Sequence, residues 1–274
     1  MTSLPEVSII IAVYNHFDWL EMILTALKYQ SFRDFEVIIA DDGSNSDTVE
    51  AIARWAQSAP FTIRHCWHDD RGWRKNIMLN TAVRASSGRY LAFLDGDCIP
   101  SPSWLADHIA LRKHHMALAG RRMDLPVSIS NSIKATDIDS PSRLRWLALK
   151  AFAGAVKEGT HGKLRCLRFP CPQFLPLLRR KKDILGCNFS LYKDDLLAVN
   201  GFDERYLAPG TGEDTDLELR LTNAGMTVST FSHYMIVYHR NHQRLAMDSS
   251  ENAAILAQNR ADKVTATPYG INHR

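Results

Sequence analysis

The sequence VSIIIAV at residues 7–13 indicates the fold class. It is a nearly unbroken run of apolar and β-branched side chains, which is typical of a strand buried on both faces in a parallel sheet. Residues 19–27 then place apolar side chains at helical spacing. Further strands are predicted at 35–40, 61–66 and 90–94, each preceded by a helical pattern or a turn. This alternation predicts an α/β protein with an open, mostly parallel, doubly wound sheet.

Length and composition are those of an ordinary globular protein. The chain has 274 residues, of which 45% are hydrophobic and 23% charged. These values exclude a disordered chain, a collagen-like repeat and a coiled coil, and we expect one large domain or two small ones. The run at 7–13 is too short to span a bilayer and lacks the basic flank of a signal peptide. Five cysteines without CxxC spacing indicate reduced thiols in a cytoplasmic protein and no zinc cluster.

Positive charge is concentrated in one segment. Residues 143–182 contain eleven lysines and arginines and one acid, a net charge of +10, so the rest of the chain carries −7 of the overall +3. The segment is also rich in leucine and aromatic residues. This composition favours contact with an anionic membrane surface or an anionic acceptor, although a solvated helical face with its own small core explains it equally well. No nucleic-acid motif accompanies the charge, so we expect no nucleic-acid partner.

Polar residues follow each predicted strand of the first half. They are Tyr14-Asn15, Asp41-Asp42, Asp69-Asp70 and Asp95-Gly96-Asp97. Ligands of open α/β sheets bind beyond the carboxyl ends of the strands, so we expect these residues to line one site. Asp95 and Asp97 offer the carboxylate oxygens that bind Mg²⁺ or Mn²⁺ together with phosphate. Asp-Gly-Asp is also a good turn, but its position directly after a strand favours a metal site.

Two further clusters lie in the last third of the chain. Glu213, Asp214 and Asp216 follow a glycine-rich loop at a predicted helix start. The helix dipole explains one or two acids there, and a carboxylate close to metal and substrate is the expected general base for a hydroxyl nucleophile. His239 and His242 follow the last predicted strand. Their spacing favours one of them as a further ligand of the same metal.

Five motifs in fixed order resemble a known enzyme family. They are Ser8-Ile9-Ile10-Ile11-Ala12-Val13-Tyr14-Asn15, Asp41-Asp42-Gly43-Ser44, Leu94-Asp95-Gly96-Asp97, Gly201-Phe202-Asp203-Glu204 and Gly212-Glu213-Asp214-Thr215-Asp216-Leu217. Together they resemble a family 2 glycosyltransferase of the GT-A fold. Residues 188–242 are also similar to the C-terminal half of galactosyl- and N-acetylgalactosaminyl-transferases. The resemblance does not reach residues 123–183.

The resemblance implies a nucleotide-sugar donor bound at the strand ends. By position, Ala12, Tyr14 and Asp42 would line the nucleoside pocket, with Asp42 a partner for a uracil ring. The remaining donor contacts implied by the resemblance are Arg74, Lys75, Asn76 and Asp95, the last of them at the ribose or the donor sugar.

The resemblance also implies a metal and a catalytic base. Asp97 would bind Mn²⁺ or Mg²⁺, with His242 or His239 completing the shell, since the spacing does not decide between the two. Asp214 would be the catalytic base and Glu213 would contact a sugar. Such a cation would neutralise the charge that develops on a nucleoside diphosphate leaving group. One base opposite that group suffices for a single displacement, which inverts the anomeric centre.

We therefore expect an inverting, metal-dependent glycosyltransferase. It would move a hexose or N-acetylhexosamine from a nucleotide-sugar, most simply a UDP-sugar, to a glycan acceptor such as lipopolysaccharide core, capsule or another lipid-linked saccharide. Its expected location is the cytoplasm, with peripheral contact at the inner membrane face. One alternative is a nucleotidyltransferase that makes sugar nucleotides, but residues 13–17 are not the glycine-rich triphosphate loop that it needs. The other is a non-catalytic scaffold, which the intact acids argue against.

The expected organisation has four parts. Residues 1–122 form the nucleotide-sugar-binding half, and 123–183 form a basic, apolar helical insert that contacts the acceptor or the membrane. Residues 184–249 form the acceptor and catalytic half of the same domain, with a strand at 228–237. Residues 250–274 form a helix and a tail.

Overall fold

The computed structural model describes residues 4–158, 167–168, 179–180, 183–210, 212–231, 233–242 and 247–272. Its main sheet consists of β1 (Val7–Val13), β2 (Phe35–Asp41), β3 (Ile63–Trp67), β4 (Tyr90–Asp95), β6 (Met116–Ala119), β8 (Arg179–Arg180), β9 (Asn188–Tyr192) and β10 (Thr227–Phe231). Their order across the sheet is β3-β2-β1-β4-β9-β6-β10-β8. Much of the predicted basic insert lies outside the described residues, as do Cys166 and Cys171. The other cysteines, Cys66, Cys98 and Cys187, are free thiols.

The predicted strand–helix alternation of the first half is confirmed. Strands β1 to β4 are parallel, with β1 between β2 and β4. The helices between them are α1 (Phe17–Leu27), α2 (Ser46–Gln57) and α3 (Lys75–Ala85). Ile9 and Ile11 pack in the core that contains Leu24 of α1, whereas Ile10 packs in the core that contains Met78 of α3. Because helices cover both faces, β1 needs apolar residues on both, which explains its continuous apolar run.

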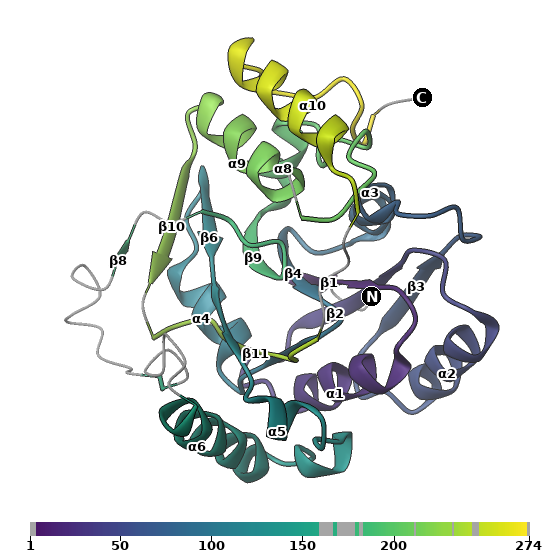
Figure 1. Ribbon diagram of the computed structural model, residues 1–274, viewed down its shortest axis with the longest axis vertical. Helices are drawn as coiled ribbons and strands as arrows, with labels where there is room; N and C mark the ends of the chain where they lie inside the picture. The colour runs from purple at the N-terminus through teal and green to yellow at the C-terminus, as the bar shows by residue number, and fades with distance from the viewer. Residues whose placement is uncertain are drawn as a thin grey trace.

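The second half extends the sheet with mixed strand directions. Strand β9 is antiparallel to both β4 and β6, and β6 is parallel to β10. The remaining helices around the sheet are α4 (Trp104–Leu111), α8 (Lys193–Ala198), α9 (Glu213–Asn223) and α10 (Ser250–Ala261). In Figure 1, α1 and α2 lie below the strands, and α3, α8, α9 and α10 lie above them. The sheet is therefore doubly wound, as predicted.

A second, three-stranded sheet, called here the small sheet, lies beside the main one. It contains β5 (Cys98–Pro100), β7 (Arg121–Asp124) and β11 (Ile236–His239), with β11 in the middle. The single strand predicted at 228–237 is wrong. The chain leaves β10, turns through positive φ angles of 69° at His233 and 53° at Met235, and enters the small sheet as β11. The register of β11 on β7 places His239 opposite Asp124.

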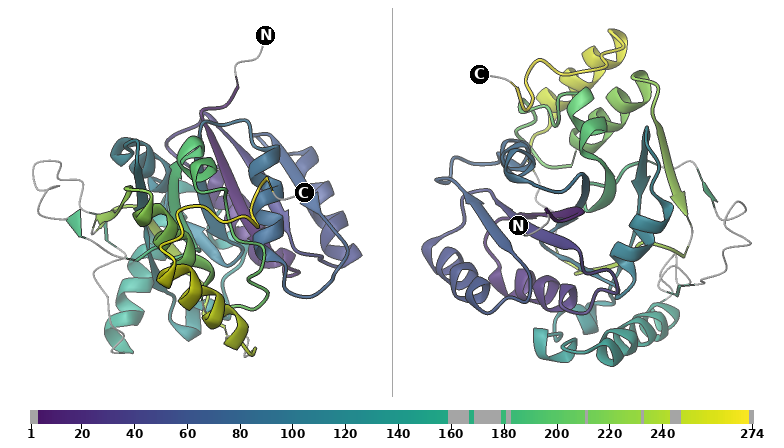
Figure 2. Two further views of the ribbon diagram at one scale, coloured as in Figure 1. Left: turned by 90° about the horizontal axis from the view of Figure 1, so that it is seen from above. Right: turned by 180° about the vertical axis from the view of Figure 1, so that it is seen from behind.

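The described part of the predicted insert packs on the body of the protein. It contains α5 (Val127–Ser130), η1 (Ala135–Asp137) and α6 (Pro141–Lys157). The buried face of α6, with Leu144 and Leu147, shares a core with Ile236 and Tyr238 of β11. Helix α6 is therefore held against the small sheet, at the lower edge of the molecule in Figure 1 and in the rear view of Figure 2. No helix in the described ranges is long and apolar enough to cross a membrane.

Candidate active site

Three side chains meet where β5 and β11 border the end of β4. One ligand atom from each of Asp97, His239 and His242 lies within 4.8 Å of the others, and we call these residues the metal triad. Nε2 of His242 lies 2.8 Å, and Nε2 of His239 3.3 Å, from the same oxygen, Oδ2 of Asp97. The spacing in the sequence left the choice between the two histidines open, and the structure brings both to Asp97.

Asp124 orients the metal triad. Its Oδ1 lies 2.8 Å from Nδ1 of His239, which leaves Nε2 of that ring facing Asp97. Burial alone would raise the pKa of Asp97, but hydrogen bonds from both histidines hold it well below its usual range. Burial alone would lower the pKa of His239, but the carboxylates of Asp124 and Asp97 raise it to about 9. The triad thus attracts positive charge, either a proton or a metal cation.

The loop that carries His242 is fixed to α1. The backbone N–H of Arg240 donates to the carbonyl oxygen of Asp97 at 3.0 Å. The Arg240 guanidinium pairs with Asp18 at 3.0 Å and lies 4.7 Å from the ring centroid of Trp19. The Trp19 ring is also 5.5 Å from the His242 ring. These contacts hold both histidines of the triad near Asp97 although more than 140 residues separate them in sequence.

A second group of charged side chains adjoins the triad through Asp95. Nζ of Lys75, at the start of α3, lies 2.9 Å from Oδ1 of Asp95 and 3.3 Å from Oε1 of Glu213. Burial would lower the pKa of Lys75, but these acids and Asp214 raise it well above its usual value. We call Lys75, Asp95, Glu213 and Asp214 the carboxylate–lysine cluster. Only Gly96 separates Asp95 from Asp97 of the metal triad, so the two groups adjoin each other.

Asp214 sits in a tight contact with the chain before β9. The N–H of Gly186 donates to Oδ2 of Asp214 at 2.7 Å, and a Cβ at position 186 would lie only 2.3 Å from Oδ1. Burial and the charge of Glu213 raise the pKa of Asp214 to about 7, against the opposing charge of Lys75. A carboxyl group with a pKa near the working pH is well suited to accept a proton as a general base.

The other two acids of this helix start have different environments. Oε1 of Glu213 faces Lys75, while Oε2 is buried and has no hydrogen-bond partner among the described residues. Leaving a buried carboxylate oxygen unpaired is unfavourable, so a ligand hydroxyl is its expected partner. Asp216 is fully buried, pairs with Arg220 at 2.7 Å and accepts a hydrogen bond from Asn259 at 2.7 Å. Asp216 therefore anchors α9 and is not available to substrate.

The predicted nucleoside residues meet at the ends of β1 and β2. Asp42 accepts a hydrogen bond from the backbone N–H of Arg74 at 2.8 Å, and its other oxygen lies 3.0 Å from Nε2 of His68. Burial raises the pKa of Asp42. The half-exposed Tyr14 donates its hydroxyl to Asp70 at 2.9 Å. An aromatic ring beside carboxylates with remaining acceptor capacity suits a nucleobase and ribose.

Ala12 lies between the predicted nucleoside residues and the carboxylate–lysine cluster, whereas Asn76 points away from both. Ala12 pairs in register with Asp95 across β1 and β4. Asn76 is 2% exposed and donates its amide to the carbonyl oxygen of Asp203 at 2.8 Å. The structure thus brings Asn76 to the contact between α3 and the loop before α9, away from the exposed edge where a donor contact was predicted.

The family follows from a comparison with known proteins. A sequence profile of glycosyl transferase family 2 matches residues 8–163, more than half of the chain. The chain belongs to glycosyl transferase family 2. The match extends into residues 123–183, which the short motifs alone do not reach. A second profile, for the N-terminal domain of galactosyltransferase, matches residues 177–243 and so includes Asp214 and both histidines of the metal triad.

Three known glycosyltransferases illustrate how far the similarity of this family 2 chain extends in sequence and in fold. Chondroitin synthase of Escherichia coli is 29% identical over 229 residues, which is 80% of this chain but only 32% of that protein. Staphylococcus aureus TarS in complex with UDP-GlcNAc has a TM-score of 0.61 at 15% identity, over 94% of this chain and 69% of that one. The mannosyltransferase PcManGT from Pyrobaculum calidifontis, in complex with GDP-Man and Mn²⁺, has a TM-score of 0.58 at 18% identity, over 89% and 59%. These structures confirm the GT-A fold.

Two residues of the site escaped the sequence analysis. His68 follows β3 directly, so the same strand-end rule that selected Asp42 could have found it. Asp124 is a single acid in a region without regular pattern. Only the pairing of β7 with β11 places it beside His239, so no local signal marks it.

Proposed function

We propose that this chain transfers a hexose or N-acetylhexosamine from a UDP-sugar to a hydroxyl group of a glycan, with inversion at the anomeric carbon. The observation that supports this most is the junction of the metal triad with the carboxylate–lysine cluster through Asp95, Gly96 and Asp97. It combines a cation site with a proton acceptor. Family membership favours transfer over the nucleotidyltransferase alternative, and the intact Asp214 and Glu213 favour an enzyme over a scaffold.

The donor would lie along the strand ends. Tyr14 and Asp42 would contact the nucleoside, with Ala12 beneath it, and Asp95 would contact the ribose or the sugar. Asp97, His239 and His242 fit Mn²⁺ or Mg²⁺ because one carboxylate and two imidazoles leave coordination positions for diphosphate oxygens, and the nitrogen donors favour Mn²⁺. The ion would neutralise charge on the departing UDP. The UDP-GlcNAc complex of TarS and the complex of PcManGT with GDP-Man and Mn²⁺ support this proposal.

The acceptor would be activated by Asp214. Its carboxylate takes the proton of the acceptor hydroxyl as the oxygen attacks the anomeric carbon. The N–H of Gly186 holds one oxygen of Asp214, which leaves the other for that proton. Lys75 keeps Asp95 and Glu213 in place, and the free Oε2 of Glu213 accepts a hydroxyl of the bound sugar. A single displacement of this kind inverts the configuration.

We infer that the acceptor is a saccharide carried on a lipid or a growing polysaccharide at the cytoplasmic face of the membrane. The basic, apolar character of residues 143–182 supports this inference. The similarity to chondroitin synthase supports a polysaccharide product. Because the chain spans about a third of that enzyme, the full range of its activity is part of the proposal.

Release of UDP from UDP-sugars tests the proposed reaction. UDP-glucose, UDP-galactose and their N-acetylamino forms are incubated with the protein and Mn²⁺, with and without short saccharides. We expect one donor to be turned over and Asp214→Asn to slow this by about 10²–10⁴-fold. Asp47→Asn, an exposed acid on α2, is the matched control and should keep full activity.

Two results together would refute the proposed transfer. The wild-type protein would release no UDP from any donor, and none of the UDP-sugars would raise its melting temperature in the presence of Mn²⁺, although a bound ligand must stabilise the folded state.

A further inference from the structure

Helix α6 has apolar side chains on two faces. The first face, with Leu144, Leu147, Ala151 and Ala155, is buried against the small sheet. The second carries Trp146, Leu149 and Val156, which are 62%, 50% and 50% exposed. Their spacing of three and seven residues places them in one stripe along the helix. Packing within the described chain explains the first face and leaves the second one uncovered.

Basic side chains flank the exposed stripe. Arg145, Lys150 and Lys157 are exposed on α6, and none of them has an ion-pair partner within the described part of the chain. The helix itself contains no acid between Pro141 and Lys157. Surface helices usually balance such charges with acids at helical spacing. The outer side of α6 therefore combines positive charge with exposed apolar area.

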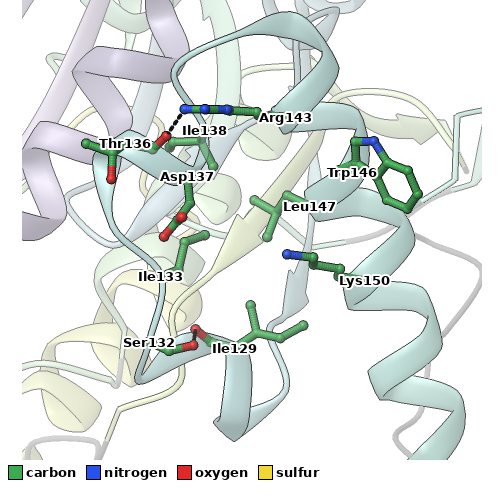
Figure 3. Close-up of a pocket in the computed structure, with 10 residues that line it drawn as sticks. All are labelled: Ile129, Ser132, Ile133, Thr136, Asp137, Ile138, Arg143, Trp146, Leu147 and Lys150. Carbon is green, nitrogen blue, oxygen red and sulfur yellow. Dashed lines mark hydrogen bonds between the residues drawn. The ribbon is translucent and has the colours of Figure 1, made fainter.

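A cavity of about 770 Å³ opens beside the same helix. Its lining is mixed. Apolar surface comes from Ile129, Ile133, Ile138 and Leu147, and polar groups come from Ser132, Thr136, Asp137, Arg143 and Lys150. In Figure 3 the Lys150 side chain extends from α6 toward this cavity, while the indole of Trp146 turns outward. The isoleucine and leucine side chains of this lining can contact part of a hydrocarbon chain, and the ammonium group of Lys150 can bind an anionic headgroup.

We propose that the outer face of α6, together with this cavity, docks onto an anionic lipid bilayer. Trp146, Leu149 and Val156 would enter the region between headgroups and acyl chains, where tryptophan is favoured. Arg145, Lys150 and Lys157 would bind anionic headgroups. The complementary charge and the unpaired state of the basic groups favour lipid over a second apolar protein surface.

This docking would place the active site at the membrane. The buried face of α6 packs on β11, which ends at His239, and on Ile99 of β5, which follows Asp97. The small sheet therefore carries the metal triad at its strand ends and contacts α6 through its buried side chains. The biological role of this docking rests on the proposed transfer to a lipid-linked saccharide. Binding of α6 to the bilayer requires neither a bound donor nor turnover.

Co-sedimentation with vesicles tests the surface. We expect binding to phosphatidylcholine vesicles that contain phosphatidylglycerol, weak binding to phosphatidylcholine alone, and release by high salt. Arg145→Gln with Lys150→Gln removes two charges and should weaken binding about 25-fold, at roughly 1 kcal/mol for each charge. Trp146→Ser with Leu149→Ser should weaken it on the order of tenfold or more. Arg54→Gln on α2 and Leu197→Ser on α8, both exposed, are the matched controls.

Several outcomes would overturn the inference. They are no binding to anionic vesicles in low salt, equal binding with and without phosphatidylglycerol, or equal effects of the α6 variants and the controls. A wild-type dimer in solution that the α6 variants convert to a monomer, without vesicle binding, would assign the face to a second copy instead. UDP release should be unchanged in every variant. If neither the wild-type protein nor any variant releases UDP while the wild type still binds anionic vesicles, the proposed transfer is refuted and the membrane-binding surface is retained.

Discussion

Asp214→Asn should stabilise the fold and slow the reaction. The pKa of Asp214 is about 7, against 3.8 for an ordinary aspartate. The folded protein therefore binds one more proton than the unfolded chain between these pH values, and stability falls as pH rises through this window. Three units at about 1.4 kcal/mol each give about 4 kcal/mol. Asp214 retains partial exposure, so we expect about 2 kcal/mol from removing its charge at pH 8.

Urea unfolding at pH 5 and pH 8 measures this effect. At pH 5 the wild-type carboxyl is protonated, so wild type and Asp214→Asn should differ little; at pH 8 the variant should be the more stable. Asp216→Asn, two residues along the same helix, is the matched comparison. It leaves the buried Arg220 without its partner and should destabilise at both pH values by about 3–5 kcal/mol. An Asp214→Asn variant that gains no stability between pH 5 and pH 8 would refute the reasoning.

Three further changes test the rest of the site. Lys75→Met removes the charge that opposes the rise in the pKa of Asp214, so the acidic limb of the pH–rate profile should move to higher pH; an unmoved limb would contradict this. Asp124→Ala should weaken Mn²⁺ binding about 10–100-fold in calorimetric titration, and unchanged affinity would show that Asp124 does not orient His239. Gly186→Ala places a Cβ 2.3 Å from Oδ1 of Asp214; kcat should fall on the order of 10²-fold with KM little changed, and full activity would mean that the base is not held there.

The first half of the fold could be predicted because its signals are local. Strands β1, β2 and β4 are buried on both faces, and each is a short apolar run. Tyr14-Asn15 follows β1, and acids lie at the ends of β2 and β4. The strand-end rule then gathers those acids without any knowledge of contacts. The same rule grouped Asp42, Asp95 and Asp97, which follow β2 and β4, the two strands on either side of β1.

The second half depends on contacts between distant residues. The apolar run at 228–237 looks like one strand because its composition is uniform. It divides into β10 and β11 near His233 and Met235, whose positive φ angles are uncommon for residues other than glycine. The place of Asp124 beside His239 follows from the pairing of β7 with β11 across more than a hundred residues. Neither feature is encoded by a short motif.

Four of the acids in residues 203–216 fall into two groups, and the difference between the groups supports the proposed site. Asp203 and Asp216 each have an arginine at 2.7 Å, so their charges are compensated within the fold. Asp214 has a raised pKa, and Glu213 has the only buried carboxylate oxygen without a partner among the described residues. Both share with Asp95 a single cation, Lys75. The fold thus pairs Asp203 and Asp216 with arginines and leaves Asp214 and Glu213 incompletely paired. Such incomplete pairing is unfavourable unless a bound donor, an acceptor hydroxyl and its proton supply the missing partners.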